Sequence, residues 1–132
     1  MNKNESPKSV AAIRLVLTAG SIVFGSSALF LLALPGLFLQ LLGLDTNDAL
    51  QWSMRMIGIT LVALAGNMFA NARRGSIGAV RLAGRVMQIS AGALGVLTLM
   101  IPAPTTWFTV LYAIVGFSFS AAYTIAFLLK SK

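Results

Sequence analysis

The sequence predicts an all-α integral membrane protein, a four-helix bundle that forms a single transmembrane domain over residues 1–132. Hydrophobic residues make up 58% of the chain and charged residues only 10%, with a mean hydropathy of +0.87. A soluble domain usually carries about 25% charged residues, and a soluble fold of this size could not bury so much apolar surface. The apolar residues also fall into four long runs, separated by Pro, Gly and charged residues. We therefore expect these runs to lie in a lipid bilayer.

The first helix is expected over about residues 11–34. Its apolar run, Leu15–Leu34, has 20 residues and spans about 30 Å as a helix, which is enough to cross a bilayer core. The apolar part of a signal peptide has only about 7–15 residues, so the run favours an uncleaved helix. Pro35 and Gly36 break or kink this helix. The next octet, "LFLQLLGL", is too short to span again and either extends the kinked helix or lies in the interface.

The other three helices are expected over about residues 50–72, 77–101 and 107–129. Asp45 or Asn47 is placed to cap the second helix, with Asp48 in its first turn. "RRGS" forms a tight loop after this helix, and "PAPTT" ends the third one. Four crossings return the chain to the side on which it starts.

Basic residues gather on one side of the predicted bundle. Nine of them lie at the two termini or around the loop between the second and third helices: Lys3, Lys8, Arg14, Arg73, Arg74, Arg81, Arg85, Lys130 and Lys132. The other side has Arg55, with Asp45 and Asp48. The positive-inside rule then places both termini in the cytoplasm, with a bacterial inner membrane as the expected location. Basic residues at the edges of apolar runs, without a separate basic domain, argue against nucleic-acid binding.

The chain contains no Cys and no His, and its only acidic residues are Glu5, Asp45 and Asp48. This composition excludes disulfides, zinc sites built from Cys or His, His-ligated haem and Ser-His triads. The six Met residues are scattered, which favours packing over soft-metal binding. The apolar runs contain no carboxylate and no His, one of which a proton-coupled transporter usually needs within the membrane. We therefore expect no enzyme activity, no cofactor and no metal site.

Two segments of the chain resemble each other. A shift of 67 residues aligns "IRLVLTAGSIVFGSSALFLLALP" (13–35) with "VRLAGRVMQISAGALGVLTLMIP" (80–102) and matches Arg14 with Arg81 and Pro35 with Pro102. Because both helices would start on the same side, the match suggests a parallel two-plus-two repeat. Biased composition also produces such matches, so a chance similarity stays open.

Stripes of small and polar residues run along each predicted helix at alternating spacings of four and three, which keeps each stripe on one face. Small residues let helices approach closely in lipid. The predicted packing residues are Gly25, Ala28, Gly92, Gly95, Gly116 and Ser120. A further predicted packing stripe, on the second helix, comprises Met56, Thr60, Ala63, Asn67, Ala70 and Arg74.

Arg81, Arg85 and Gln88 share one face at the start of the third helix. Only 16 uncharged residues separate Arg85 from Pro102, and their roughly 24 Å as a helix falls short of a bilayer core of about 30 Å. Arg85 is therefore pulled to the boundary of the core, and orientation with snorkelling explains it. A contact with anionic lipid headgroups or an acidic partner is the functional alternative; its residues would be Arg73, Arg74, Arg81, Arg85 and Gln88. A polar cavity open to the cytoplasm would be lined by Asn67, Asn71, Arg81, Arg85 and Gln88.

The segment "ALFLLALPGLFLQLLGLD" followed by "LQWSMRMIGITLVALAGNMFANAR" resembles the DoxX-like group of small four-helix membrane proteins. The resemblance covers about residues 13–85 and rests on a first helix ending in Pro, the "LLGL" turn, and a second helix that opens with "RMIG" and closes with "NAR". It implies the four-helix fold. Many members have no assigned activity, and some relatives are linked to membrane redox or respiratory complexes. This chain lacks the Cys that a thiol-redox relative would need.

The expected function is that of a small non-enzymatic inner-membrane protein, an accessory or scaffold subunit of a larger complex. The alternative is a binder or carrier of a lipid or small amphiphile at the basic, cytoplasm-facing site. An oligomeric small transporter, similar in size to the small multidrug resistance proteins, is a further alternative. The missing intramembrane carboxylate argues against it.

Overall fold

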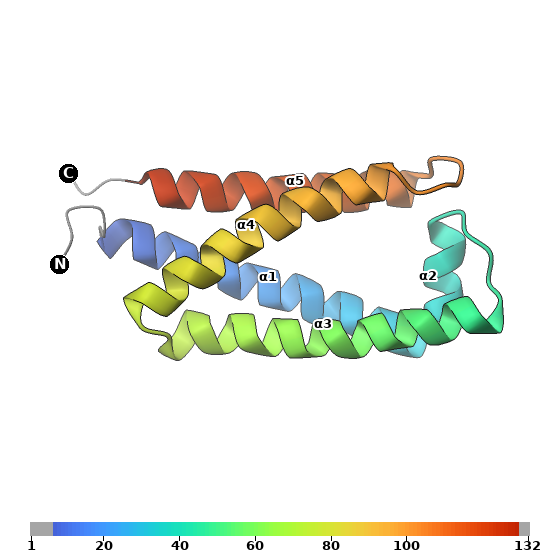
Figure 1. The fold of residues 1–132 in the computed structure, drawn as a ribbon, viewed down its shortest axis with the longest axis horizontal. Coiled ribbons are helices and arrows are strands. Elements are labelled where there is room, and N and C mark those ends of the chain that lie inside the picture. Colours follow the sequence, from blue (N-terminus) through green and yellow to red (C-terminus); the bar gives the residue numbers. More distant parts are fainter. Residues whose placement is uncertain (1–6, 130–132) are drawn as a thin grey trace.

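The computed structural model describes residues 7–129, and all regular structure within this range is helical. The helices are α1 (Pro7–Ala33), α2 (Pro35–Leu41), α3 (Asp48–Arg74), α4 (Ile77–Leu99) and α5 (Trp107–Leu128) (Figure 1). Four of them are long and apolar enough to cross a membrane, and α2 is too short. Within the described residues, the prediction of an all-α protein with four helices of membrane-spanning length and hydropathy is confirmed. The predicted basic residues Lys3, Lys130 and Lys132 lie outside the described residues.

Local sequence signals explain where the helices start. The first begins at Pro7, four residues earlier than expected, because the fixed φ of Pro suits the first position of a helix. Asn47 caps α3 by accepting a hydrogen bond from the amide of Leu50 at 2.9 Å, with Asp48 in the first turn. This confirms one of the two predicted caps. The side chains of Ser76 and Thr106 cap α4 and α5 in the same way.

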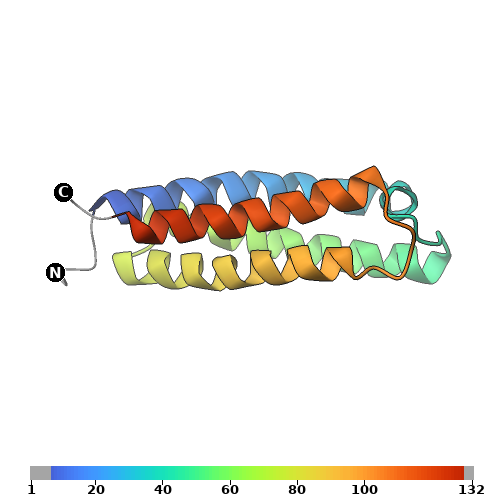
Figure 2. The same cartoon turned by 90° about the horizontal axis from the view of Figure 1, so that it is seen from above.

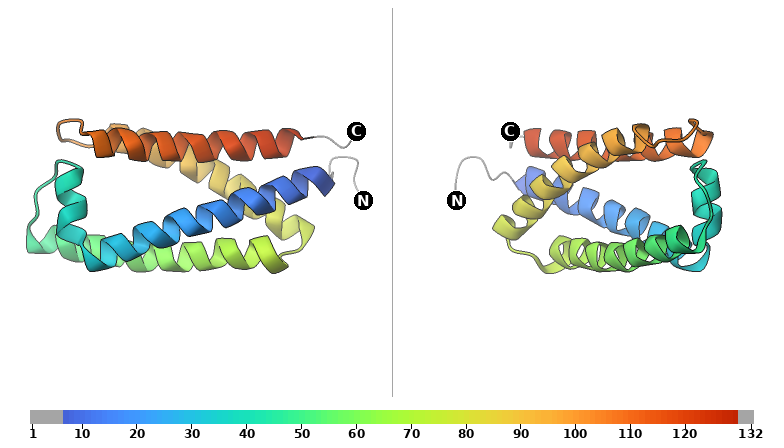
Figure 3. Two further views of the ribbon diagram at one scale, coloured as in Figure 1. Left: turned by 180° about the vertical axis from the view of Figure 1, so that it is seen from behind. Right: turned by 45° about the vertical axis from the view of Figure 1, so that its right-hand side comes forward.

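The long helices form two layers, with α1 and α5 in one and α3 and α4 in the other (Figure 2). Within this arrangement α1 and α4 are diagonals that cross between α3 and α5 (Figures 1 and 3). The start of α1, the end of α5 and the α3–α4 loop therefore lie at one end, which we call the basic end. The short α2 and the α4–α5 loop lie at the other, which we call the α2 end.

Two antiparallel pairs, α1 with α3 and α4 with α5, make the closest packing. Gly58 on α3 lies against α1, where an added Cβ would be 3.0 Å from Leu32 and 3.4 Å from the carbonyl oxygen of Ala28. Gly116 on α5 lies against the α4 backbone, where an added Cβ would be 2.9 Å from the carbonyl oxygen of Ala91. Glycines thus allow the backbones to approach within each pair.

At the α2 end the two pairs separate, and α2 lies between them. The octet after Pro35 neither continues α1 nor spans again. Its Phe38 ring contacts rings of both pairs edge-on, with centroid distances of 5.5 Å to Phe30 and 5.4 Å to both Phe108 and Tyr112. Gly43, which follows the C-cap of α2, has a φ of +76°, a backbone conformation that favours glycine. A wedge of aromatic residues thus closes this end of the bundle.

Candidate functional site

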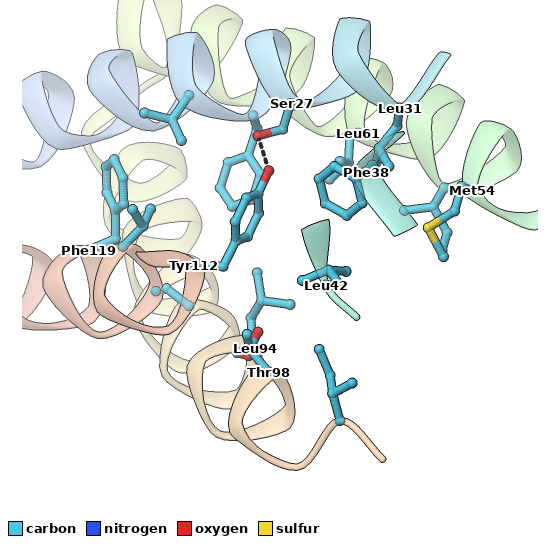
Figure 4. A pocket seen from close by; sticks show the side chains of 17 residues that line it. Ser27, Leu31, Phe38, Leu42, Met54, Leu61, Leu94, Thr98, Tyr112 and Phe119 are labelled. Carbon is cyan, nitrogen blue, oxygen red and sulfur yellow. Dashed lines mark hydrogen bonds between the residues drawn. The ribbon is translucent and has the colours of Figure 1, made fainter. Parts of the chain in front are cut away.

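A cavity of about 230 Å³ lies between the two helix pairs, next to α2. All five helices contribute to its wall, as Figure 4 shows for Ser27 and Leu31 of α1, Phe38 of α2, Met54 and Leu61 of α3, Leu94 and Thr98 of α4, and Tyr112 and Phe119 of α5. Because each helix supplies only a few of these residues, no single stretch of the sequence identifies the cavity. The sequence analysis placed its candidate sites elsewhere and missed this one.

The polar groups in the cavity wall are paired within the protein. The hydroxyls of Ser27 and Tyr112 are 3.0 Å apart and hydrogen-bond across the α1–α5 interface (Figure 4). The hydroxyl of Thr98 donates to the carbonyl oxygen of Leu94 on its own helix at 2.7 Å. The remaining lining side chains are hydrocarbon, aromatic or thioether. The surface of the cavity is therefore apolar.

The cavity lies beside the outer surface where α3 and α4 diverge. Ile57 on α3 and Leu94 on α4 line it, yet they are 45% and 41% exposed. Large apolar side chains that line a cavity while half exposed mark its rim. This rim faces sideways, across the bundle axis, between two helices of membrane-spanning length.

A second, shallower groove of about 310 Å³ lies between α3 and α4 towards the basic end. It contains Asn67 and Asn71, as expected for the polar cavity, but its other lining residues are apolar and include Leu82 and Val86. Both amides donate to carbonyl oxygens of their own helix, from Asn67 to Ala63 at 3.1 Å and from Asn71 to Asn67 at 3.0 Å.

The structure does not bring the five residues of the expected polar cavity together. Arg81, Arg85 and Gln88 share one face of α4, but this face contacts α5 rather than α3. Gln88 donates to the hydroxyl of Thr124 on α5 at 2.6 Å and accepts from Arg85 at 2.8 Å. The error arose because a shared helix face does not say which neighbour covers that face.

Both arginines of this face contact the same aromatic ring, that of Phe127. The guanidinium carbons of Arg85 and Arg81 lie 4.2 Å and 5.4 Å from the ring centroid of Phe127 on α5. These cation–π distances hold the charged groups against the protein at the basic end. Arg73 makes a similar contact of 5.3 Å with Phe69, and Arg73 and Arg74 are both exposed.

Arg14, expected as an orientation signal and as the counterpart of Arg81 in the repeat, connects α1 to the end of α3. Its guanidinium donates to the carbonyl oxygens of Asn71 at 3.2 Å, Ala72 at 3.0 Å and Gly75 at 2.7 Å. The last carbonyls of a helix lack intrahelical partners and carry the negative end of the helix dipole. The guanidinium therefore supplies hydrogen-bond donors to carbonyl oxygens at the end of α3 and a positive charge at the negative end of the helix dipole. The spacing of Arg14 from these residues along the chain gives no sign of the contact.

The predicted packing residues lie in different surroundings. Gly25 and Ala28 are on the α3-facing side of α1, with Ala65 near Gly25. Gly92, Gly95, Gly116 and Ser120 lie between α4 and α5, where an added Cβ at Gly92 would be 3.2 Å from the hydroxyl oxygen of Ser120.

The second-helix stripe does not pack inside the bundle, contrary to the prediction, although Asn67 also lines the groove between α3 and α4. All of its members are exposed on the side of α3 opposite Gly58: Met56, Thr60, Ala63, Asn67, Ala70 and Arg74. Ser53, also exposed, extends it by one position. We call these seven residues the outward stripe. The prediction was wrong because α3 packs on α1 through another face, which contains Gly58, Ala65, Met68 and Ala72.

Tyr123 on α5 is fully buried, and within the described residues its hydroxyl has no hydrogen-bond partner. An unpaired buried hydroxyl costs about 1–3 kcal/mol. Tyr123→Phe is therefore expected to raise the free energy of unfolding by about 1 kcal/mol, as measured by denaturant unfolding in micelles. Tyr112→Phe is the matched control: it removes the hydrogen bond with Ser27 and should lower stability. A loss of stability in both variants would contradict this interpretation.

Within residues 7–129, no group of three or more His, Cys, Asp or Glu residues is placed to hold a metal ion.

The candidate functional features of the described residues are the apolar cavity at the α2 end, the arginine–aromatic contacts at the basic end and the outward stripe. No family model, curated protein or solved structure matches the chain.

Proposed function

We propose that the protein is a small non-enzymatic subunit of a larger membrane assembly, which it joins through the outward stripe of α3. The exposed amide of Asn67, in the second half of a membrane-spanning helix, carries this proposal. One N–H of this amide donates to the carbonyl oxygen of Ala63, but a carboxamide has a second N–H and an acceptor oxygen as well. Such polar groups are costly in hydrocarbon, and a helix that covers them can hydrogen-bond with them. Side-chain amides and hydroxyls commonly hydrogen-bond across the interfaces between membrane helices.

The spacing of the outward stripe supports the same function. Ser53, Thr60 and Asn67 follow one another at intervals of seven residues, with Ala63 between Thr60 and Asn67 and Ala70 three residues after Asn67. Steps of three and four residues produce the seam of a left-handed helix pair, and the alanines let a second backbone approach closely. The partner is therefore a transmembrane helix, from another subunit or from a second copy of this chain.

A photoreactive amino acid tests this proposal when it replaces Thr60 in native membranes. Irradiation should yield a discrete adduct with a membrane protein or with a second copy. Val62, which is 48% exposed and lies about 200° further round the helix, is the matched control and should label only lipid. Lipid adducts alone at both positions, together with a monomer in mild detergent, would rule the proposal out.

Orientation and location form part of the proposal. Both termini would be cytoplasmic, in a bacterial inner membrane. The described basic residues support this, because Arg14, Arg73, Arg74, Arg81 and Arg85 belong to the basic end, whereas Asp45, Asp48 and Arg55 belong to the α2 end. The proposed parallel repeat is supported by the arrangement of α1 and α4, since each is a diagonal that packs antiparallel to the next long helix, α3 and α5 respectively (Figure 3). The DoxX-like relationship remains a proposal based on the sequence resemblance.

Lipid binding at the basic end is a second proposed function. Arg73 and Arg74 are exposed there, and clusters of basic residues at the cytoplasmic surface attract anionic headgroups. Arg81 and Arg85 would contribute less than expected, because Phe127 lies against both guanidinium groups.

A further inference from the structure

The position of the cavity along the helices determines which solvent surrounds it. On α3 its lining extends from Met54 to Leu61, which is about 9–20 Å from the start of that helix at 1.5 Å per residue. A bilayer core is about 30 Å thick. With the four long helices spanning the membrane, the cavity lies in the half of the bilayer nearest α2, and its rim faces acyl chains.

The chemistry of the wall selects an apolar occupant. The hydroxyls of Ser27, Tyr112 and Thr98 are already hydrogen-bonded within the protein, and no charged side chain lines the cavity. A polar or charged ligand group would lose its own solvation without gaining a free partner. A hydrocarbon group loses nothing on entry from lipid and gains contacts with the surrounding side chains.

The size and shape of the cavity narrow the choice of occupant. Its lining on α1 runs from Val23 to Leu31, a length of about 12 Å. Its 230 Å³ exceeds the roughly 150 Å³ of an apolar cavity that accepts benzene and falls below the roughly 300–1,000 Å³ of pockets for drug-sized molecules. A long space of this volume fits a chain rather than a fused ring system.

We infer that this cavity binds an unbranched hydrocarbon chain, supplied by a lipid of the surrounding bilayer. The chain enters sideways over the rim formed by Ile57 and Leu94, where α3 and α4 diverge, and its end lies against Tyr112 and Phe119. The headgroup stays in the leaflet at the α2 end. This site is separate from the outward stripe and from the basic end.

The experiment uses the full chain in nanodiscs that contain a phosphatidylcholine with a diazirine at the end of one acyl chain. After irradiation, peptide mass spectrometry locates the adducts. Adducts are expected on lining residues such as Leu61 and Val115 in preference to Leu97, which is 62% exposed and outside the cavity. A free fatty acid with the same label forms a second arm. Cavity labelling by the fatty acid alone would overturn the bilayer lipid as the source, and labelling spread evenly over exposed residues would overturn the site.

Substitutions at the rim provide the matched comparison. Leu94→Trp narrows the entrance and should reduce cavity labelling about tenfold, the equivalent of roughly 1.4 kcal/mol of binding free energy. Leu97→Trp, on the same helix but outside the cavity, should leave it unchanged. Leu94→Ala shortens the same half-exposed side chain and should increase labelling, so the test does not depend on the Trp variant folding. Equal labelling in all three variants would overturn the inference, whether or not the outward stripe binds a partner.

Discussion

Replacing Arg14 with Met is expected to lower the free energy of unfolding by about 2–3 kcal/mol. The substitution keeps an apolar stem but removes three hydrogen bonds from a charged group to the carbonyl oxygens of Asn71, Ala72 and Gly75. Asn71 and Ala72 lie in the last turn of α3 and Gly75 is its C-cap, so the substitution also removes a favourable contact between a cation and the helix dipole. Denaturant unfolding in mixed micelles, followed by circular dichroism, measures the effect.

Two further variants make this result specific. Arg14→Lys keeps the positive charge without the planar fork of donors and should fall between Met and the wild type. Arg74→Met removes an exposed arginine from the same end of α3 and should change stability by less than about 0.5 kcal/mol. Similar losses for Arg14→Met and Arg74→Met would show that the end of α3 responds to total charge rather than to this contact.

Gly116→Ala is expected to cost about 1–3 kcal/mol through overpacking between α4 and α5. The added Cβ would be 2.9 Å from the carbonyl oxygen of Ala91 and 3.1 Å from both the Cα and the amide nitrogen of Gly95. All three are backbone atoms, so a side-chain rotation cannot relieve the contact, and the helices must move apart.

Gly66→Ala is the control for Gly116→Ala. An added Cβ at Gly66 on α3 meets nothing within 4 Å, so the change should leave stability unchanged or raise it by up to about 1 kcal/mol, because Ala loses less backbone freedom on folding. The same unfolding measurement compares the two variants. A loss at Gly66 as large as that at Gly116 would point to a general effect on the helices instead of a contact between α4 and α5.

The sequence predicted the number, type and approximate limits of the four long apolar helices, because these follow from the length of apolar runs and from local caps such as Asn47. It did not predict which helix faces meet. In lipid, small and polar stripes favour contact with any neighbouring helix, so the stripe containing Thr60 and Asn67 was indistinguishable from the faces that pack inside the bundle.

Contacts between distant parts of the chain also could not be predicted from the sequence. The Ser27–Tyr112 pair is separated by 85 residues, and the Arg14 contacts by 57 to 61. Periodicity places each residue on a face of its own helix but does not fix the crossing of α1 and α4. That crossing turned Arg85 towards Phe127 and left an apolar cavity at the opposite end.

Because α1 and α4 cross near one end of the bundle, a small change in their tilt has its largest effect at the other end. The two diagonals touch near the basic end, where Ile13 lies against Gly84, and Leu31 beside the cavity is 18 residues, or about 27 Å, further along α1. A rotation of two degrees about that contact displaces Leu31 by about 1 Å at this helical rise. Membrane helices adjust their tilt to bilayer thickness. A change in the tilt of one helix pair against the other would therefore change the width of the space between them.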